Sequence, residues 1–215
     1  MLGGFFLIKD RILKLAGANF ADKTKLILDL GCGNKPYYHN NVNGKLVCFD
    51  IKKTKINDVI GDASSLPFKN NAFDVILSIN SFYYFNNPFI SVKEVSRILK
   101  KNGKFILIMP FIYPIHDAPD DKYRFTEFGI KSLLEDDFAI KELQCIGGIF
   151  NLPAVIMHSL LKGFRFMPKP FKIISIPLTI VLYPIYMLAQ VFSLLDFFDR
   201  TGRWPTYYFV LAAKK

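Results

Sequence analysis

The sequence predicts a three-layer α/β/α sandwich with a mainly parallel sheet. Short apolar segments alternate with polar crossovers, and this alternation is typical of parallel strands joined by connections over the sheet. Residues 73–79 form an apolar run of the kind that is buried on both faces. An apolar helical insertion is expected before the last strand, because residues 149–205 are long and poor in charge compared with an ordinary turn.

Length and composition set the outer limits of this prediction. The 215 residues suffice for one well-buried domain over residues 1–215 that carries the 149–205 insertion. Cys32, Cys48 and Cys145 form no C-x-x-C pair, so neither disulfides nor zinc are expected. No basic residue precedes the apolar run at residues 2–8, which favours a cytoplasmic protein over a secreted one.

The first expected element is an amphipathic helix over residues 1–20. Its apolar side chains recur at spacings of three and four, at Phe5, Ile8, Ile12 and Leu15. We expect this helix to cover an open edge of the domain. The alternative is a helix that lies on a membrane surface.

The later elements follow from strand patterns and from helix capping. Strands are expected at residues 25–30, 45–50, 73–79 and 104–111, with two final antiparallel strands at 138–147 and 207–213. Asn87 and Pro88 predict the start of a helix that ends at Asn102-Gly103, and Thr126 predicts the start of another that runs to about residue 136. The short polar segment between the first two strands leaves no room for a full helix there.

Three successive strand ends carry residues that suit a cofactor. Gly31 and Gly33 permit a sharp turn with bare backbone N–H groups, and Asp50 follows Gly31 by 19 positions, where a carboxylate can accept hydrogen bonds from a ribose. These two features also describe a nicotinamide dehydrogenase. The third glycine of the pyrophosphate-binding pattern is replaced by Pro36, after Lys35, which favours a cofactor without phosphate.

From Leu28 to Pro110 the chain resembles a class I S-adenosylmethionine-dependent methyltransferase of the type 11-like group, which has a Rossmann-like fold. The matching segments are LDLGCGNKPY, FDI, GDASSLPF, FDVILSINSFYYF and RILKKNGKFILIMP. The resemblance implies S-adenosylmethionine as cofactor. It implies that the methionine end is held by Asp29, Gly31, Cys32 and Gly33, the ribose by Asp50 beside Ile51, and the adenine by Asp62 and Ala63, with Asn80 near the sulfonium and substrate. The alternative for Asn80 is a strand-end cap.

His116 is the candidate catalytic base. It lies in the loop expected over the substrate mouth, in a segment that matches an H-x-x-P-x-D-x-x-R-[YF]-T pattern found in some of these methyltransferases. The alternative is a loop-ordering network in which Asp121 pairs with Arg124 and Thr126 caps a helix. His39 has no partner in the sequence and is expected at the surface, and His158 is expected within the insertion.

Several other chemistries are disfavoured. No [DN]-P-P-[YFW] motif follows residues 73–79, which disfavours methylation of amino nitrogens, and no cysteine is placed for a covalent pyrimidine mechanism. The three histidines lack metal-ligand spacing, so no metal is expected. Aromatic residues do not cluster within basic stretches, so no nucleic-acid partner is expected.

The insertion contains two uncharged stretches, 143–161 and 173–195, around a basic linker with Lys162, Arg165, Lys169 and Lys172. The second stretch has 23 residues, more than the ~20 that cross a bilayer. A single crossing conflicts with a final strand that returns to the same sheet, and Pro177 and Pro184 should break or kink a continuous helix. We therefore expect helices in one leaflet. The alternatives are an apolar lid over the substrate and a homodimer interface.

The sequence thus predicts a methyltransferase acting on a hydroxyl or carbon of a hydrophobic or lipid-linked small molecule. A net charge of +10 with a mean hydropathy of +0.24 favours a cytoplasmic enzyme peripheral to the inner face of a membrane. Three alternatives remain: a soluble methyltransferase for a sugar or other metabolite with a dimerising insertion, a non-catalytic membrane scaffold with the same fold, and, less favoured, an RNA methyltransferase.

Overall fold

A computed structural model describes residues 6–17, 23–34, 37–164 and 167–215. The described chain divides into two compact units. The first, here called the sheet unit, contains residues 12–111, 115–144 and 207–215. The second, here called the hairpin unit, contains residues 6–11, 112–114 and 145–206.

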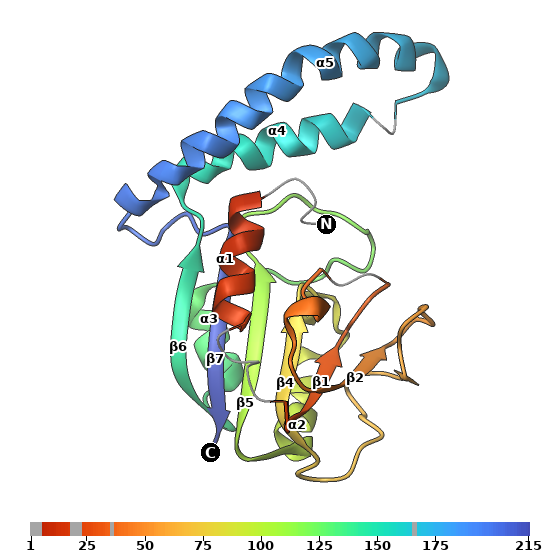
Figure 1. Ribbon diagram of the computed structural model, residues 1–215, viewed down its shortest axis with the longest axis vertical. Coiled ribbons are helices and arrows are strands. Elements are labelled where there is room, and N and C mark those ends of the chain that lie inside the picture. The colour runs from red at the N-terminus through yellow and green to blue at the C-terminus, as the bar shows by residue number, and fades with distance from the viewer. Residues whose placement is uncertain (1–5, 18–22, 35–36, 165–166) are drawn as a thin grey trace. The chain divides into compact units, whose positions relative to one another are not determined.

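The sheet has seven strands in the order β3-β2-β1-β4-β5-β7-β6 (Figure 1). β1 pairs in parallel with β2 and β4, and the parallel pairing continues to β3 on one side and β5 on the other. β7 runs antiparallel to β5. The strands are β1 (Leu26–Leu30), β2 (Lys45–Asp50), β3 (Val59–Ile60), β4 (Phe73–Ile79), β5 (Leu99–Pro110), β6 (Phe138–Ile146) and β7 (Tyr207–Lys214). The predicted α/β fold with a mainly parallel sheet is confirmed.

The central strands β1, β4 and β5 form the core of the sheet unit. Five consecutive side chains of β4, from Val75 to Ile79, are buried, as are the last six residues of β5. Burial on both faces explains why these strands read as apolar runs instead of alternating patterns. This rigid centre fixes the positions of the loops that leave the carboxyl ends of the strands.

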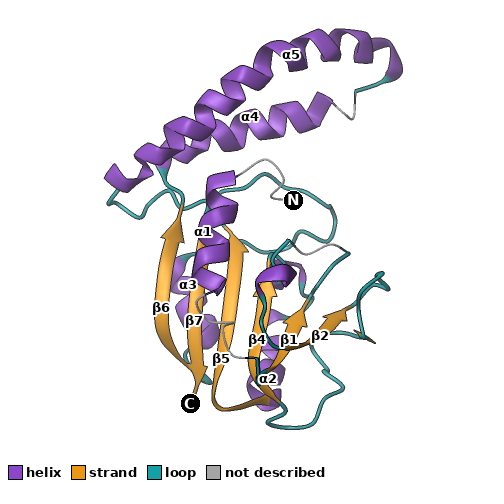
Figure 2. Ribbon diagram, in the orientation of Figure 1, coloured by secondary structure: helices purple, strands orange, loops and turns teal. Residues whose placement is uncertain are grey.

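The capping residues place two helices as predicted. α2 (Pro88–Ile98) begins after Asn87, whose side chain accepts a hydrogen bond from the Ile90 N–H. α3 (Glu127–Leu134) begins after Thr126, whose hydroxyl accepts from the Gly129 N–H. Both helices lie behind the sheet in Figure 2. Between β1 and β2 the described chain has only a short 3-10 helix, His39–Asn41, as the polar connection predicted.

The predicted end of the helix at Asn102-Gly103 is wrong. α2 ends at Ile98, and Leu99 already pairs with Phe73 as the first residue of β5. The register then jumps to Lys104 opposite Val75, so the residues between loop out within the strand. Asn102 takes a left-handed backbone with φ of 59°, so the Asn-Gly pair forms an irregularity in the strand instead of a helix end.

The first helix, α1 (Phe6–Gly17), is shorter than the expected 1–20 span. Ile8 and Ile12 are buried, as the amphipathic pattern predicts. Phe5 and the ends of the expected span lie outside the described residues.

The hairpin unit consists mainly of α4 (Leu152–Gly163) and α5 (Lys169–Phe192), followed by a 3-10 helix, Ser193–Phe198. Pro177 and Pro184 were expected to break or kink the helix, and they do not break it, because α5 is one helix that contains both prolines. A proline removes a single backbone donor, so the remaining residues of the 24-residue helix keep the hydrogen-bond ladder. Residues 169–198 are long and apolar enough to cross a membrane by length and composition.

Candidate functional site

The carboxyl ends of four parallel strands bring most of the predicted site residues together. Gly31 follows β1, Asp50 ends β2, Asp62 follows β3 and Asn80 follows β4. Because these strands are neighbours in the order β3-β2-β1-β4, their ends meet at one edge of the sheet. Ligands of open α/β sheets bind at this edge.

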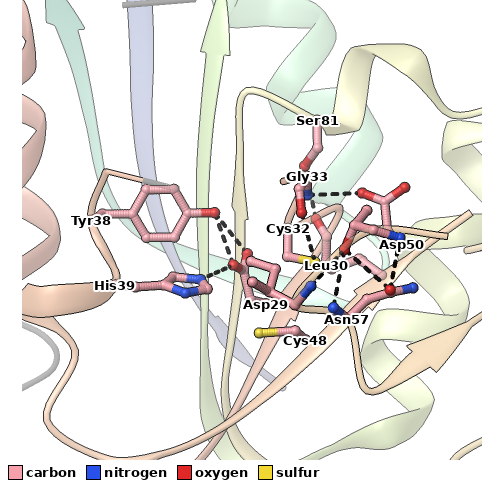
Figure 3. A network of polar contacts seen from close by, with 12 residues as sticks. Asp29, Leu30, Cys32, Gly33, Tyr38, His39, Cys48, Asp50, Asn57 and Ser81 are labelled. Carbon is pink, nitrogen blue, oxygen red and sulfur yellow. Dashed lines mark hydrogen bonds and ion pairs between the residues drawn. The ribbon is translucent and has the colours of Figure 1, made fainter. Parts of the chain in front are cut away.

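The Gly31–Gly33 loop is tied to the end of β2 (Figure 3). The N–H groups of Gly31 and Cys32 both donate to the Phe49 carbonyl, at 2.8 and 3.1 Å. Gly31 has a φ of 84°, and a Cβ there would lie 2.3 Å from the Ser81 Cβ. Gly31 is therefore required by both conformation and space, since the loop passes directly against Ser81.

Gly33 differs from Gly31 because it faces open space. Its φ is 63°, but no atom lies within 4 Å of the position that a Cβ would take. Its N–H donates to Asp50 Oδ2 at 2.9 Å. The glycine loop thus leaves room for a ligand above Gly33 and fixes one oxygen of the Asp50 carboxylate.

Asp50 is held in place by backbone groups on both oxygens. Besides the Gly33 contact, Oδ1 accepts from the Lys52 N–H at 3.0 Å. Two backbone bonds orient the carboxylate while its remaining lone pairs can accept from a ligand. The adjacent Ile51 is 56% exposed, so its side chain offers an apolar surface beside this acid.

Asp62 occupies the next strand end. Its Oδ1 accepts from the Ser64 N–H at 2.7 Å, and Oδ2 lies 3.4 Å from the Asn86 side-chain amide. The Ser64 backbone bond is the main reason that the pKa of Asp62 is lowered, so this group is a carboxylate at neutral pH. Ala63 is buried beside it.

Asn80 shows features of both interpretations that the sequence allows. Its backbone N–H donates to the Ile108 carbonyl at 2.9 Å, which extends the pairing of β4 with β5 as a strand-end residue would. Its φ is 55°, an uncommon backbone for a residue other than glycine. Its Oδ1 is buried and has no hydrogen-bond partner among the described residues, so an acceptor is left over at this strand end.

Asp29 is placed differently from the other acids. Its side chain is fully buried, and the Tyr38 hydroxyl lies 2.9 and 3.0 Å from its two oxygens (Figure 3). His39 Nε2 lies 2.6 Å from Oδ2. Burial raises the pKa of Asp29, while His39 and Tyr38 oppose this shift. These contacts bind residues 38 and 39 to the end of β1.

His39 was expected at the surface, and this expectation is wrong. The ring is bonded to a buried carboxylate, and its side chain is only 22% exposed. The sequence analysis did not include Tyr38 and His39 among the site residues. The one feature that pointed to them is the short connection between β1 and β2, which has no room for a full helix. A connection too short for a full helix must turn back toward β1, which brings Tyr38 and His39 onto Asp29.

Asp29, His39 and Cys48 also place one possible metal-ligand atom each within 4.8 Å of one another. Two of these groups already bond each other, because His39 Nε2 contacts Asp29. Burial raises the pKa of Cys48 to about 11, which keeps a thiol proton at neutral pH and opposes metal binding.

His116 is part of a buried polar network in the sheet unit. Its Nδ1 lies 3.2 Å from Asp121 Oδ2, and its Nε2 lies 3.0 Å from the Tyr83 hydroxyl. Asp121, with a side chain 1% exposed, also pairs with Arg124 through both carboxylate oxygens. Burial alone would raise the pKa of Asp121, but Arg124 and the His116 N–H lower it overall.

These groups suit the adenosine part of S-adenosylmethionine. Two oriented carboxylates at Asp50 and Asp62 are acceptors for ribose hydroxyls and an adenine amine, and the space above Gly33 admits a ligand close to the backbone. The replacement of the third glycine, at Pro36 beside Lys35, lies outside the described residues.

Comparison with known proteins gives the same assignment. Residues 28–107, from β1 into β5, match a family model described as a methyltransferase domain. A solved structure described as a putative methyltransferase from Bacillus halodurans covers 94% of this chain and 98% of its own, with a TM-score of 0.59 and 18% identity. Residues 28–107 therefore carry a methyltransferase domain of the class I S-adenosylmethionine-dependent type.

Two further comparisons extend this result. This chain is 33% identical over 148 residues to an uncharacterized protein of Methanocaldococcus jannaschii, a match that covers 64% of each chain. It is 29% identical over 114 residues to the ubiquinone/menaquinone biosynthesis C-methyltransferase of Haemophilus ducreyi, covering 53% of this chain and 39% of the relative. The chain thus spans less than two thirds of the length of these relatives.

A solved structure with S-adenosyl-L-methionine bound has a similar fold. The phosphoethanolamine N-methyltransferase 2 of Haemonchus contortus, solved in complex with S-adenosyl-L-methionine, has a TM-score of 0.58 at 13% identity. The match covers 95% of this chain and 52% of the other. At this identity the likeness extends to the fold alone.

Proposed function

We propose that this protein transfers a methyl group from S-adenosylmethionine to a hydroxyl or carbon of a hydrophobic or lipid-linked small molecule at a membrane surface. The observation that carries the transfer reaction is the set of strand ends at Gly31–Gly33, Asp50 and Asp62, which presents oriented carboxylates beside an open glycine loop. The substrate class depends on the exposed apolar surface of the hairpin unit.

In this proposal the cofactor supplies an electrophilic methyl group, and the residues of the chain bind and orient it. Asp50 would accept from the ribose hydroxyls and Asp62 from the adenine amine, with Ile51 and Ala63 as apolar neighbours. The backbone at Gly33 would lie against the methionine end of the cofactor. Asn80 Oδ1 would supply a hydrogen-bond acceptor near that end. Asp29 would act indirectly, since its oxygens already bond Tyr38 and His39. Holding both reactants in line is the main contribution in such a displacement.

His116 is proposed as the base for an acceptor hydroxyl. Asp121 beside Nδ1 favours a proton on that nitrogen, which leaves Nε2 as an acceptor. Nε2 now bonds the Tyr83 hydroxyl, so an acceptor hydroxyl would have to take that position. His116→Gln should lower the rate of transfer to a hydroxyl while the dissociation constant of S-adenosylmethionine stays near the wild-type value. Unchanged transfer would leave His116 as a residue that orders its loop.

A labelling assay tests the substrate class. The full chain is incubated with methyl-labelled S-adenosylmethionine and either a membrane lipid extract or an aqueous metabolite extract. We expect label in the organic phase with wild type and with the control Asp136→Ala, an exposed acid beyond α3, and none with Asp50→Ala. Label confined to the aqueous phase would favour a polar metabolite. Cofactor binding without any transfer would favour a membrane scaffold.

The relatives have names that describe two different reactions, methyl transfer and hydroxylation. One relative is a C-methyltransferase of ubiquinone and menaquinone biosynthesis, which supports a hydrophobic acceptor. Another, of human origin, is named an arginine-hydroxylase, so the fold is also used for other chemistry. Transfer of label in the assay separates these two possibilities.

A further inference from the structure

The buried face of α5 is polar and its exposed face is apolar, which is the reverse of a helix in a water-soluble domain. Its buried positions are Ser175, Tyr186 and Gln190, and Ser193 continues this stripe just beyond the helix. The spacing of these polar positions is that of one helix face. In a soluble domain the buried face is apolar and the exposed face polar.

The exposed side of α5 is correspondingly apolar. Ile173 is 77% exposed, Ile180 68% and Leu188 68%. Most of the remaining turns contribute side chains of the same kind: Phe171, Ile174, Ile176, Leu178, Val181, Ile185, Val191 and Phe192. A surface of this extent exceeds the scattered apolar residues that face water on ordinary monomers.

The hydroxyls of the polar stripe are satisfied inside the hairpin unit, whereas the buried Gln190 Nε2 has no hydrogen-bond partner among the described residues. The hydroxyls of Ser175, Thr179 and Ser193 donate to backbone carbonyls of their own segment at 2.8, 2.7 and 2.6 Å. The Tyr186 ring lies 5.9 Å from the His158 ring of α4, and Figure 1 shows the two helices side by side. Polar groups paired within a helix pair, with apolar side chains outside, are the arrangement that a hydrocarbon solvent requires.

Charge along the hairpin favours an anionic surface. No Asp or Glu occurs from Cys145 to Leu195, whereas Lys162, Lys169 and Lys172 lie around the turn between α4 and α5. At the other end, Arg200 and Arg203 are balanced by Asp196 and Asp199, so the net positive charge lies at the turn. Basic side chains at the turn can reach lipid headgroups while the apolar face is buried.

The connections of the hairpin determine how it can lie in a bilayer. The chain enters α4 from β6 and leaves toward β7, and both strands belong to the same sheet. The 12 residues of α4 span only about 18 Å, too short to cross a core of about 30 Å. The hairpin must therefore enter and leave from the same side.

We propose that α4 and α5 form a monotopic anchor, embedded in one leaflet of an anionic bilayer with the Ser175–Gln190 stripe sealed between the helices. This inference deepens the proposed function, since it names the membrane partner of the same protein and its mode of contact. A homodimer formed through the apolar face is the competing outcome of the test.

Quenching by brominated lipids tests the proposal in the full chain. Trp204 is the only tryptophan, so a Trp204→Phe background allows one reporter at a time. Ile180→Trp places a reporter on the apolar face, and Phe128→Trp places a matched one at a 77% exposed position on α3. With vesicles containing phosphatidylglycerol and brominated chains, we expect strong quenching at position 180 and none at 128.

Charge and oligomeric state complete the test. Replacing Lys162, Lys169 and Lys172 by Gln should weaken partition onto anionic vesicles by about 100-fold. Absence of quenching at position 180 would overturn the proposal, as would a stable dimer in detergent-free solution that hides this position. Titration of S-adenosylmethionine into the same variants separates the two claims: binding without quenching removes only the anchor, and quenching without binding removes only the methyltransferase function.

Discussion

Gly31 and Gly33 stand two residues apart in the same loop, yet they meet different constraints. Both have a positive φ, but only Gly31 faces a side chain, that of the buried Ser81. The Ser81 hydroxyl is itself fixed by a 2.8 Å bond to the Leu30 carbonyl. A side chain at position 31 must therefore displace the end of β1 or the start of the segment after β4.

This difference predicts unequal effects of two alanine substitutions. Gly33→Ala should cost about 1 kcal/mol, from the left-handed backbone alone. Gly31→Ala should cost about 3 kcal/mol or more, because overpacking against Ser81 adds to the same strain. Urea unfolding of both variants measures the gap, and Gly31→Ala should also lose cofactor binding. Equal costs would contradict the packing described for Gly31.

At the residue scale the sequence predicts which acids stand at the strand ends, but not all of their partners. Asp50 and Asp62 lie where the strand pattern places them. The contacts of Asp29 with Tyr38 and His39 depend on how a short irregular connection turns back toward β1, which no periodicity in the sequence encodes. The same limit applies to Tyr83, which meets His116 from 33 positions away.

At the scale of elements, the loop over residues 115–126 is ordered by one buried acid. Asp121 accepts from the His116 backbone and from the Arg124 guanidinium, and Arg124 also lies 5.3 Å from the centre of the Tyr83 ring. This is the loop-ordering network that the sequence offered as the alternative to catalysis. The structure adds His116 to that network through both ring nitrogens.

Removing the Arg124 side chain should lower the free energy of unfolding by an amount that depends on pH. Arg124→Met leaves a buried carboxylate without its charged partner, at a cost of about 3 kcal/mol at pH 7. Because the folded-state pKa of Asp121 is lowered below 3.8, its stabilising contribution is present above pH 3.8 and is lost as the pH falls through the lowered value. The stability gap between wild type and variant should therefore be smaller at pH 3 than at pH 7.

Denaturant unfolding at the two pH values gives this gap, with Lys131→Met as the control. Lys131 is an exposed cation that pairs with Glu127 on the same helix, so its loss should cost little at either pH. A gap for Arg124→Met that stays constant between pH 7 and pH 3 would contradict the role assigned to Asp121.

Element boundaries show where local sequence signals suffice. The caps at Asn87 and Thr126 are local, because each side chain bonds an N–H three residues on, and both were predicted. The start of β5 was missed because it depends on the pairing of Leu99 with Phe73, a contact between distant residues. The two prolines of α5 do not break the helix, because one missing donor at each position does not end a helix of this length.

At the scale of the whole molecule, the chain combines a methyltransferase sheet with an apolar hairpin unit. The fold could be predicted because apolar strand segments alternate with polar connections along the sequence, and because the first three strands each end in or are followed by an acid or a glycine. The insertion could be located from its lack of charge, but its division into a polar inner stripe and an apolar outer face required the structure. In our proposal the sheet unit binds the cofactor and the hairpin unit binds the membrane that contains the acceptor.

The central claim is that the strand ends bind S-adenosylmethionine, and calorimetric titration tests it most directly. S-adenosylmethionine and its demethylated product are titrated into wild type, Asp50→Ala and the surface control Asp136→Ala. We predict micromolar binding to wild type and to the control, and loss of binding in Asp50→Ala. Failure of folded wild type to bind either compound, or undiminished binding by Asp50→Ala, would contradict the site described at these strand ends.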